Sequence, residues 1–294
     1  MRPPDESPWL RSHPAEDGRT VADVLAPLLP PQALRGSVLF VAAHPDDEVL
    51  GASWLLRRSP GCHVIHVTDG APRDASLRSQ GAPPTREGYA RLREEEAIAA
   101  MRLAGIAPDQ LLSLGAVDQE ATLELVTLTH YLMALVKALR PTLLVVHPYE
   151  GGHPDHDAAA FISHSAVALM ARAGRTPPTL LEMTSHQRHQ GRLVTGEFLP
   201  AREERQVATV SLSEAEREAK RRMLACYATQ ARGLEDVTVG QECYRVAPRY
   251  DFTRPPRAGT LPYESRGWRM MGARWRELAR LALETLKLPE TPWH

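Results

Sequence analysis

The feature that most constrains this chain is a short apolar run that ends in a cluster of acids. Residues 37–51 read SVLFVAAHPDDEVLG. The run from Val38 to Ala43 is apolar throughout, which is typical of a strand buried on both faces of a parallel sheet. A histidine, a proline and three acids follow at once. The sequence therefore predicts a parallel sheet with a chemical site at the end of one strand.

The acids after this run need a counter-charge. The residues concerned are His44, Asp46, Asp47 and Glu48. Three carboxylates beside an imidazole repel one another unless a cation or hydrogen-bond donors lie among them. If a helix begins after Pro45, His44 and Asp47 share a face and bind one metal ion, while Asp46 points elsewhere. The alternative is an acid-rich helix start, in which Asp46 or Asp47 caps amide groups.

A second motif of the same kind follows a later apolar run. Thr142 to Val146 reads as a buried strand, and the sequence His153-Pro154-Asp155-His156 comes shortly after it. Other segments alternate between strand and helix patterns. The expected strands are 62–67, 111–114, 179–183 and 206–211, and the expected helices are 48–57, 85–104, 123–140, 157–173 and 213–232.

This alternation predicts an α/β fold, a Rossmann-like and mostly parallel sheet flanked by helices. The carboxyl ends of parallel strands share one edge, so the two motifs are expected to meet there. We expect an N-terminal extension over 1–36, a main domain over 37–232, and an irregular C-terminal extension over 233–294 that packs on it and holds a last helix over 267–287.

Together the two motifs supply a ligand set for a metal. His44, Asp47 and one of His153 or His156 suit Zn²⁺, with Fe²⁺ as an alternative, and leave a position for water. A bound cation lowers the pKa of that water to roughly 7, and Asp46 is then placed to take its proton. The histidine left over stabilises an oxyanion or protonates a leaving amine, and Asp155 orients it.

The composition limits the classes of substrate and partner that the protein is expected to bind. The 294 residues include 35 basic and 36 acidic ones, a net charge of −1, which favours a small-molecule substrate over nucleic acid. No stretch approaches the roughly 18 apolar residues that span a bilayer. The three cysteines, Cys62, Cys226 and Cys243, show no CxxC spacing and fit a reducing compartment. We expect a cytoplasmic protein. A homo-oligomer is compatible with the sequence.

These motifs resemble those of the LmbE-like, or PIG-L, family of zinc-dependent de-N-acetylases. The resemblance covers roughly residues 37–185 and rests on four segments in the family's order: AHPDDEVLG, VTDGA, a helix with Arg93 and Glu96 that ends in AGI, and GGHPDHDAA. In one place the chain departs from the pattern. Some members carry a tyrosine just before HPDH, where this chain has Gly151 and Gly152, with Tyr149 nearby.

The resemblance implies a reaction and a role for each site residue. The family hydrolyses an acetamide, typically on an N-acetylglucosamine conjugate, when zinc-bound water attacks the carbonyl. The roles implied for this chain are zinc ligands for His44, Asp47 and His156, the general base for Asp46, the oxyanion stabiliser or acid for His153, and tuning of that histidine for Asp155.

Three alternatives remain at this stage. An amidase acting on a non-sugar or thiol-conjugate amide would use the same residues. An iron-dependent oxygenase also has a triad of two histidines and a carboxylate, although the alternating strands and helices argue against it. A non-catalytic metal- or sugar-binding module would predict a degraded motif, whereas Asp46 and His153 are both present.

Overall fold

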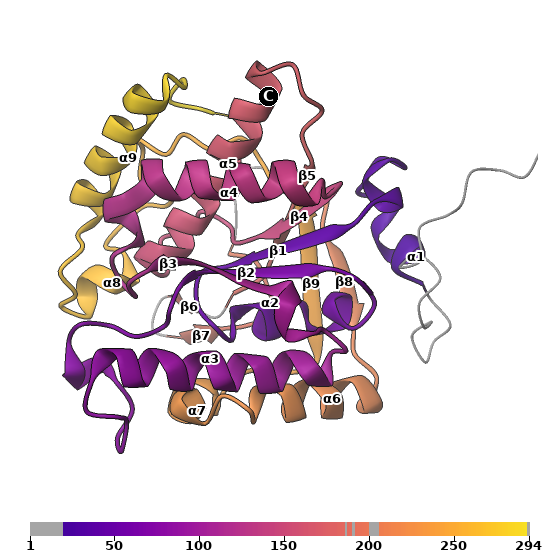
Figure 1. Ribbon diagram of the computed structural model, residues 1–294, viewed down its shortest axis with the longest axis vertical. Coiled ribbons are helices and arrows are strands. Elements are labelled where there is room, and N and C mark those ends of the chain that lie inside the picture. The colour runs from indigo at the N-terminus through magenta and orange to yellow at the C-terminus, as the bar shows by residue number, and fades with distance from the viewer. Residues whose placement is uncertain (1–19, 186, 190–191, 200–205, 293–294) are drawn as a thin grey trace, which may run out of the picture.

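The computed structural model describes residues 20–185, 187–189, 192–199 and 206–292. Residues 1–19 of the expected N-terminal extension lie outside the described part. The described residues form one central sheet with helices on both of its faces (Figure 1).

The central sheet confirms the expected α/β class. In the described part of the chain it has seven strands in the order β3-β2-β1-β4-β5-β9-β8. Its first five strands are parallel, and β9 is antiparallel to both of its neighbours. The strands are β1 (Val38–Ala42), β2 (His63–Thr68), β3 (Leu111–Ala116), β4 (Leu143–Val146), β5 (Thr179–Met183), β8 (Ala208–Ser211) and β9 (Gln241–Val246). A separate hairpin pairs β6 (Gln187–His189) with β7 (Arg192–Val194).

Helices cover both faces of the sheet. Those of the described part are α1 (Val21–Leu25), α2 (Asp47–Leu56), α3 (Arg86–Leu103), α4 (Leu125–Leu139), α5 (Pro154–Arg172), α6 (Glu214–Leu224), α7 (Ala231–Leu234), α8 (Pro262–Ser265) and α9 (Gly272–Leu286). Short 3₁₀ turns are η2 (Ala33–Arg35), η3 (Ala75–Leu77), η4 (Pro108–Gln110), η5 (Ala121–Glu124) and η6 (Ala228–Gln230). In Figure 1, α4, α5 and α9 lie above the sheet, and α3, α6 and α7 lie below it.

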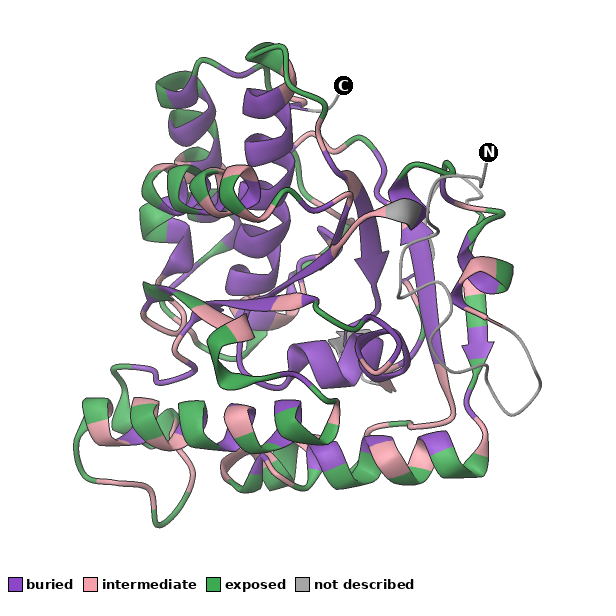
Figure 2. Ribbon diagram, turned by 45° about the vertical axis from the view of Figure 1, so that its right-hand side comes forward, coloured by how far each residue is buried: buried purple, intermediate pink, exposed green. Residues whose placement is uncertain are grey.

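The apolar run of β1 is explained by these two layers. Leu39 and Val41 belong to the core shared with α4, α5 and α9, whereas Val38 and Phe40 belong to the core shared with α2, α3 and α6. Both sides of the strand are therefore buried, as the purple strands of Figure 2 show. A strand in this position needs an apolar side chain at every residue.

The C-terminal region differs from the expectation. Residues 241–246 form β9 inside the sheet, although an irregular segment is expected there. The last helix begins at Gly272, and the helix expected over 213–232 ends at Leu224 and is followed by shorter turns. The division of the chain at residue 232 stays a proposal, and the sheet takes strands from both sides of it.

One helical segment of the described part, Ala121–Leu139, is long and apolar enough to span a membrane by length and composition alone. The residue pattern predicts a helix here but no membrane span. In the structure the segment forms η5 and α4, and its residues Leu125, Leu128, Leu132 and Val136 are buried in the core beside α5.

The strand order places the two motifs side by side. The chain moves outward from β1 to β3, and it then returns to β4 on the other side of β1. Ligands of such sheets bind outside the carboxyl ends of the strands at this reversal. The residues after β1 and the residues after β4 therefore meet at the same crevice.

Candidate active site

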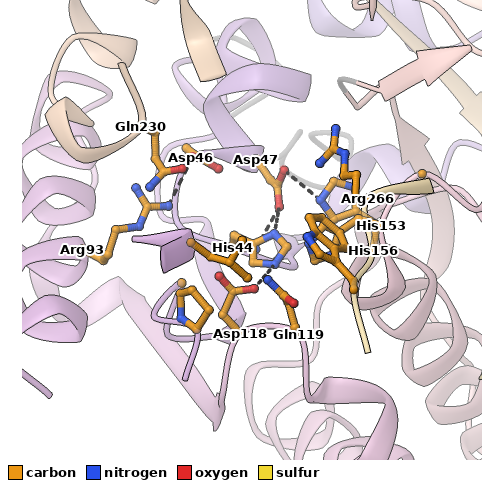
Figure 3. A pocket seen from close by; sticks show the side chains of 15 residues that line it. His44, Asp46, Asp47, Arg93, Asp118, Gln119, His153, His156, Gln230 and Arg266 are labelled. Atoms are coloured by element: carbon orange, nitrogen blue, oxygen red, sulfur yellow. Dashed lines mark hydrogen bonds and ion pairs between the residues drawn. The ribbon is translucent and has the colours of Figure 1, made fainter. Parts of the chain in front are cut away.

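A cavity of about 210 Å³ lies at this reversal (Figure 3). Five of the six residues expected from the sequence line it: His44, Asp46, Asp47, His153 and His156. The first three lie where β1 passes into α2, and the two histidines lie at the start of α5. The sixth, Asp155, is buried and lies beside His44.

Asp47 joins the two motifs. Its Oδ2 accepts a hydrogen bond from the backbone N–H of His44 at 2.9 Å and lies 3.2 Å from Nδ1 of the same residue. Its Oδ1 lies 3.3 Å from Nε2 of His156. Burial by itself would raise the pKa of Asp47, but the charges of His156 and His147 outweigh it and hold the pKa well below its usual range. Asp47 is therefore a carboxylate between two imidazoles.

His44 lies between carboxylates on both sides of its ring. Its Nδ1 faces Asp47, and its Nε2 lies 3.2 Å from an oxygen of Asp118 and 3.2 Å from one of Asp155. Burial favours the neutral ring, but the carboxylate of Asp118, with those of Asp155 and Asp47, raises the pKa of His44 well above its usual value. The imidazole of His44 is therefore surrounded by carboxylate oxygens.

Asp46 points away from Asp47 and toward α3, as Figure 3 shows. Its backbone has φ = 128°, a conformation that residues with a side chain rarely adopt and that is found at functional sites. Arg93 of α3 lies 3.2 Å from Oδ2 of Asp46 and donates to the carbonyl of Pro45. Burial raises the pKa of Asp46 to about 7, while the Arg93 guanidinium opposes this rise.

His153 caps the N-terminus of α5. Its Nδ1 accepts a hydrogen bond from the backbone N–H of Asp155 at 3.1 Å. A neutral ring that accepts at Nδ1 carries its proton on Nε2, so Nε2 is a donor. Burial, together with the charges of His44 and His156, lowers the pKa of His153 well below its usual value. The neutral donor form is therefore favoured.

Asp155 makes contacts that differ from those implied by the family resemblance. Its two carboxylate oxygens accept the backbone N–H groups of Gln119 at 2.6 Å and Ala121 at 3.2 Å. It lies 3.2 Å from His44 but 4.0 Å from His153. Its contacts thus hold the turn after β3 against α5, and tuning of His153 stays a prediction.

The first of the two glycines before the HPDH motif has a structural explanation. Gly151 has φ = 72°, and a Cβ placed there would lie 2.7 Å from Leu261 and 2.9 Å from Pro256. The C-terminal extension therefore occupies the space that a side chain would need. The hydroxyl of Tyr149 donates to the carbonyl of Arg254 at 2.9 Å, and Tyr149 does not line the catalytic cavity.

Several residues at the site were not predicted from the sequence. Asp118 follows the end of β3, so the same signal that identified the two motifs was available for it. Arg266 and Trp268 come from the segment between α8 and α9 and line the cavity without any local sequence signal. His147 directly follows β4 and stacks on His156, with ring centroids 4.3 Å apart.

The residues present fit a divalent transition metal. Imidazole and carboxylate groups are the usual ligands of zinc and iron. Candidate ligand atoms of Asp47, His147 and His156 lie within 4.8 Å of one another, and so do those of His44, His153 and His156. Of the expected ligands, Asp47 belongs to the first set, His44 to the second and His156 to both. Asp47 contacts both His44 and His156, so the two sets form one cluster.

Two further atoms bear on this fit. Nε2 of His147 accepts the backbone N–H of Ala43 at 3.1 Å, which makes His147 a support for His156 rather than a third nitrogen ligand. In the described part of the chain, Oδ1 of Asp118 is buried without a hydrogen bond, although it lies near His44. A buried carboxylate oxygen without a donor is stabilised by a nearby cation.

Residues 39–167 match the family model described as PIG-L: GlcNAc-PI de-N-acetylase. This stretch of the chain is therefore similar to the PIG-L family. The match begins in β1 and ends in α5, so it includes both site motifs. The matched family is one of de-N-acetylases, the family that the sequence motifs resemble. No curated protein matches the chain.

Solved structures share the fold of this chain. The conserved protein TT1542 from Thermus thermophilus is 22% identical with a TM-score of 0.50, over 72% of this chain and 94% of that one. A deacetylase in complex with teicoplanin is 15% identical with a TM-score of 0.50, over 73% and 100% of the two chains.

GalB, the 4-carboxy-2-hydroxymuconate hydratase from Pseudomonas putida KT2440, has the same degree of likeness. It is 16% identical with a TM-score of 0.50, over 73% of this chain and 98% of that one. Because a deacetylase and a hydratase are equally similar, these likenesses establish the fold alone, and the reaction has to be argued from the site.

Proposed function

We propose that the protein is a metal-dependent N-deacetylase that hydrolyses the acetamide of an N-acetylated sugar or sugar conjugate to acetate and a free amine. The observation that carries this proposal is the meeting of Asp46, Asp47, His153 and His156 at one small cavity. The match to a de-N-acetylase family over both motifs supports the same reaction.

In this proposal His44, Asp47 and His156 hold a divalent ion, Zn²⁺ in the first place and Fe²⁺ as the alternative. The bound ion would polarise the acyl carbonyl and acidify a water molecule. Asp47 is already ionised among the imidazoles, which suits a ligand and makes it a poor acceptor of a proton.

Asp46 is the general base. A base works best when its pKa lies near the working pH, and burial raises the pKa of Asp46 to about 7. Arg93 holds its carboxylate through Oδ2 and fixes the turn through the carbonyl of Pro45. Asp46 takes a proton from the attacking water and then delivers it to the leaving amine.

His153 stabilises the oxyanion. Its Nδ1 accepts a backbone N–H, so its Nε2–H is available for the oxygen that gains charge when the carbonyl is attacked. Its lowered pKa favours this neutral donor over an acid. Trp268 lies edge-on to the ring, with centroids 4.7 Å apart, and holds it in place.

The test is a search for acetate. Full-length protein with added Zn²⁺ is incubated with a panel of N-acetylated sugars and sugar conjugates, and acetate and free amine are both measured. The proposal predicts equal amounts of acetate and amine from at least one compound. If other amides, including amides of thiol conjugates, release their carboxylic acid and no N-acetylated sugar does, the amidase alternative would be favoured.

Addition of water to a carbon–carbon double bond without any acyl cleavage would instead favour a hydratase, the activity named for the similar fold of GalB. Binding of metal or sugar with no turnover of any compound would favour a non-catalytic module.

The remaining expectations are consistent with this role. Cys62, Cys226 and Cys243 are free thiols, which suits a reducing cytoplasm. We propose that residues 37–232 form the deacetylase domain, that 1–36 precede it, and that residues 233–294 complete it with β9 and with the wall formed by Arg266 and Trp268.

A further inference from the structure

We propose that a second cavity beside the catalytic one binds an anionic group, a carboxylate or a phosphate, on the leaving-group side of the substrate. The residues that would bind it are Arg266 and Arg269. This inference rests on the proposed deacetylase function. The second cavity measures about 510 Å³ and lies between the loop after β2, the loop after β3 and the segment from Arg266 to Arg274.

The two cavities are adjacent. Arg266, Trp268, Asp118 and Gln119 line both of them. At about 210 Å³, the catalytic cavity is smaller than the roughly 300 to 1,000 Å³ of usual ligand pockets, and the two together reach that range. A conjugate whose acetamide lies in the first cavity therefore has space for its remaining part in the second.

The segment between α8 and α9 separates the two spaces. On one side, Trp268 contacts the ring of His153, the residue proposed to stabilise the oxyanion. The guanidinium of Arg266 lies over the ring of Trp268, 4.9 Å from its centroid. In our proposal, a group attached to the amine of the substrate extends past these two side chains, which line both cavities. Figure 3 shows Arg266 beside His153 at the cavity wall.

The acids of the second cavity are engaged elsewhere. Glu120 accepts two hydrogen bonds from Arg73, at 2.8 and 3.0 Å. Asp118 faces His44 at 3.2 Å. Asp74 accepts the backbone N–H and the hydroxyl of Ser76 at the start of η3, at 2.9 and 2.7 Å. Glu120 and Asp74 are therefore held by their own neighbours, and Asp118 faces the first cavity.

Arg269 is in a different situation. In the described part of the chain it makes no hydrogen bond or ion pair. It is exposed at the cavity, where its charge acts on the carboxylate of Asp74. Arg274, farther along the segment, pairs with Glu277 on α9 at 2.7 Å. Arg269 and the guanidinium of Arg266, which lies over Trp268, thus both line the second cavity. A planar guanidinium binds a carboxylate or a phosphate through two parallel hydrogen bonds.

The position of this segment makes it a source of specificity. Residues 266–274 lie beyond the family match, which ends at residue 167. The matched region thus supplies the reacting groups, and the C-terminal extension supplies the wall that meets the rest of the substrate. Substitutions in this wall are expected to change which conjugate binds.

The test compares three amines that are product analogues. They are methyl glucosaminide, which is neutral, carboxymethyl glucosaminide and glucosamine 1-phosphate. Binding to the full chain is measured by calorimetry, with and without Zn²⁺. We expect at least one anionic amine to bind roughly tenfold more tightly than the neutral one. The anion that binds more tightly identifies carboxylate or phosphate as the recognised group.

Variants assign the effect to the cavity. Arg266→Gln and Arg269→Gln should each reduce the ratio of anionic to neutral affinity toward one. Arg280→Gln is the matched control, because Arg280 is an exposed arginine that pairs with Glu284 on the outer part of α9. A preference that survives both arginine substitutions and disappears when Zn²⁺ is removed would overturn the inference, because the metal would then be the anion's partner.

Acetate release from the N-acetylated forms of the same three compounds is measured in parallel. If all three compounds release acetate and the anionic ones show no preference in binding or rate, the second cavity does not bind an anionic group. The deacetylase proposal would then still hold. Binding that prefers the anion in an Arg269-dependent way, with no acetate from any compound, would support the cavity and contradict the proposed reaction.

Discussion

At the residue scale, the adjacent acids Asp46 and Asp47 are set apart by their surroundings. Asp47 lies among His44, His147 and His156, and its interactions with His156 and His147 favour its ionised form. Asp46 is turned away by its unusual backbone angle, is buried, and faces Arg93. Two identical carboxylates next to each other thus suit two tasks, one as a ligand and the other as a base.

We expect Asp46→Asn to lower kcat by about 10²- to 10⁴-fold while zinc stays bound, because the amide keeps the shape of the side chain but cannot accept a proton. Acetate release and metal content of the purified variant are the measurements. Asp109→Asn serves as control, since Asp109 is exposed in η4, far along the chain from both motifs. Near-normal kcat in the Asp46 variant would show that another group is the base.

Much of the site could be predicted from single residues. His44, Asp46 and Asp47 follow one buried strand and His153 and His156 follow another, so strand ends alone bring them together. Arg266 and Trp268 could not be found this way, because they reach the cavity from a segment more than 100 residues after the second motif and no periodic pattern marks them.

At the scale of elements, helix α5 carries two histidines with opposite surroundings. His156 lies at its first turn and faces Asp47. His164 lies two turns further on, fully buried, with its ring against Tyr250 and Phe252. Burial lowers the pKa of His164 to about 3.

This burial gives a prediction for stability against pH. The unfolded chain binds a proton on His164 near pH 6.5, whereas the folded chain does so only near pH 3, so folding is weakened as pH falls between these values. Between pH 7.5 and 5 the loss is about 2 kcal/mol. His164→Gln should remove this part of the decline, as measured by urea denaturation at several pH values.

The matched control is His130→Gln on α4, where the histidine is exposed. This variant should keep the pH dependence of the wild-type protein. An unchanged pH dependence in His164→Gln would mean that the folded protein already accommodates a charged ring at this position.

Strand β9 depends on a buried ion pair. Lys220 of α6 donates to Glu242 of β9 at 2.8 Å and to the carbonyl of Leu50 at 2.8 Å. Glu242 also accepts from Ser53 and from the backbone N–H of Trp54. The pair ties β9 to both α6 and α2.

Lys220→Met should lower the free energy of unfolding by about 3 to 5 kcal/mol, because it leaves a buried carboxylate without its cation. Denaturant unfolding monitored by tryptophan fluorescence measures the change. Arg221→Met is the neighbouring control, since Arg221 pairs with Glu214 on the exposed side of α6. Equal stability of the two variants would show that Glu242 is satisfied by its other partners.

The same pair explains why β9 was not predicted. In a buried strand, Glu242 and Arg245 break the apolar pattern that revealed β1 and β4. Their partners Lys220 and Glu182 are 22 and 63 residues away in the sequence. The compensation of a buried charge by a distant one leaves no local signal.

At the scale of the whole molecule, the PIG-L match ends in α5. The chain beyond it adds β5, β9 and β8 to the sheet and lines one wall of the cavity with Arg266 and Trp268. Trp275 of α9 donates from Nε1 to the carbonyl of Pro154 at 3.1 Å, which fixes the C-terminal extension to the turn that carries His153. The extension is therefore anchored to the second site motif itself.

The central claim is that the histidine and aspartate cluster holds a metal that acetamide hydrolysis requires. Metal-stripped full-length protein is titrated with Zn²⁺ while acetate release from an N-acetylated sugar conjugate is followed. Our account predicts that acetate release rises with bound zinc until one ion is bound per chain. It also predicts that the His156→Ala variant does not bind this ion and does not regain acetate release when Zn²⁺ is added. Full activity in the stripped protein, or stoichiometric zinc binding by His156→Ala, would contradict it.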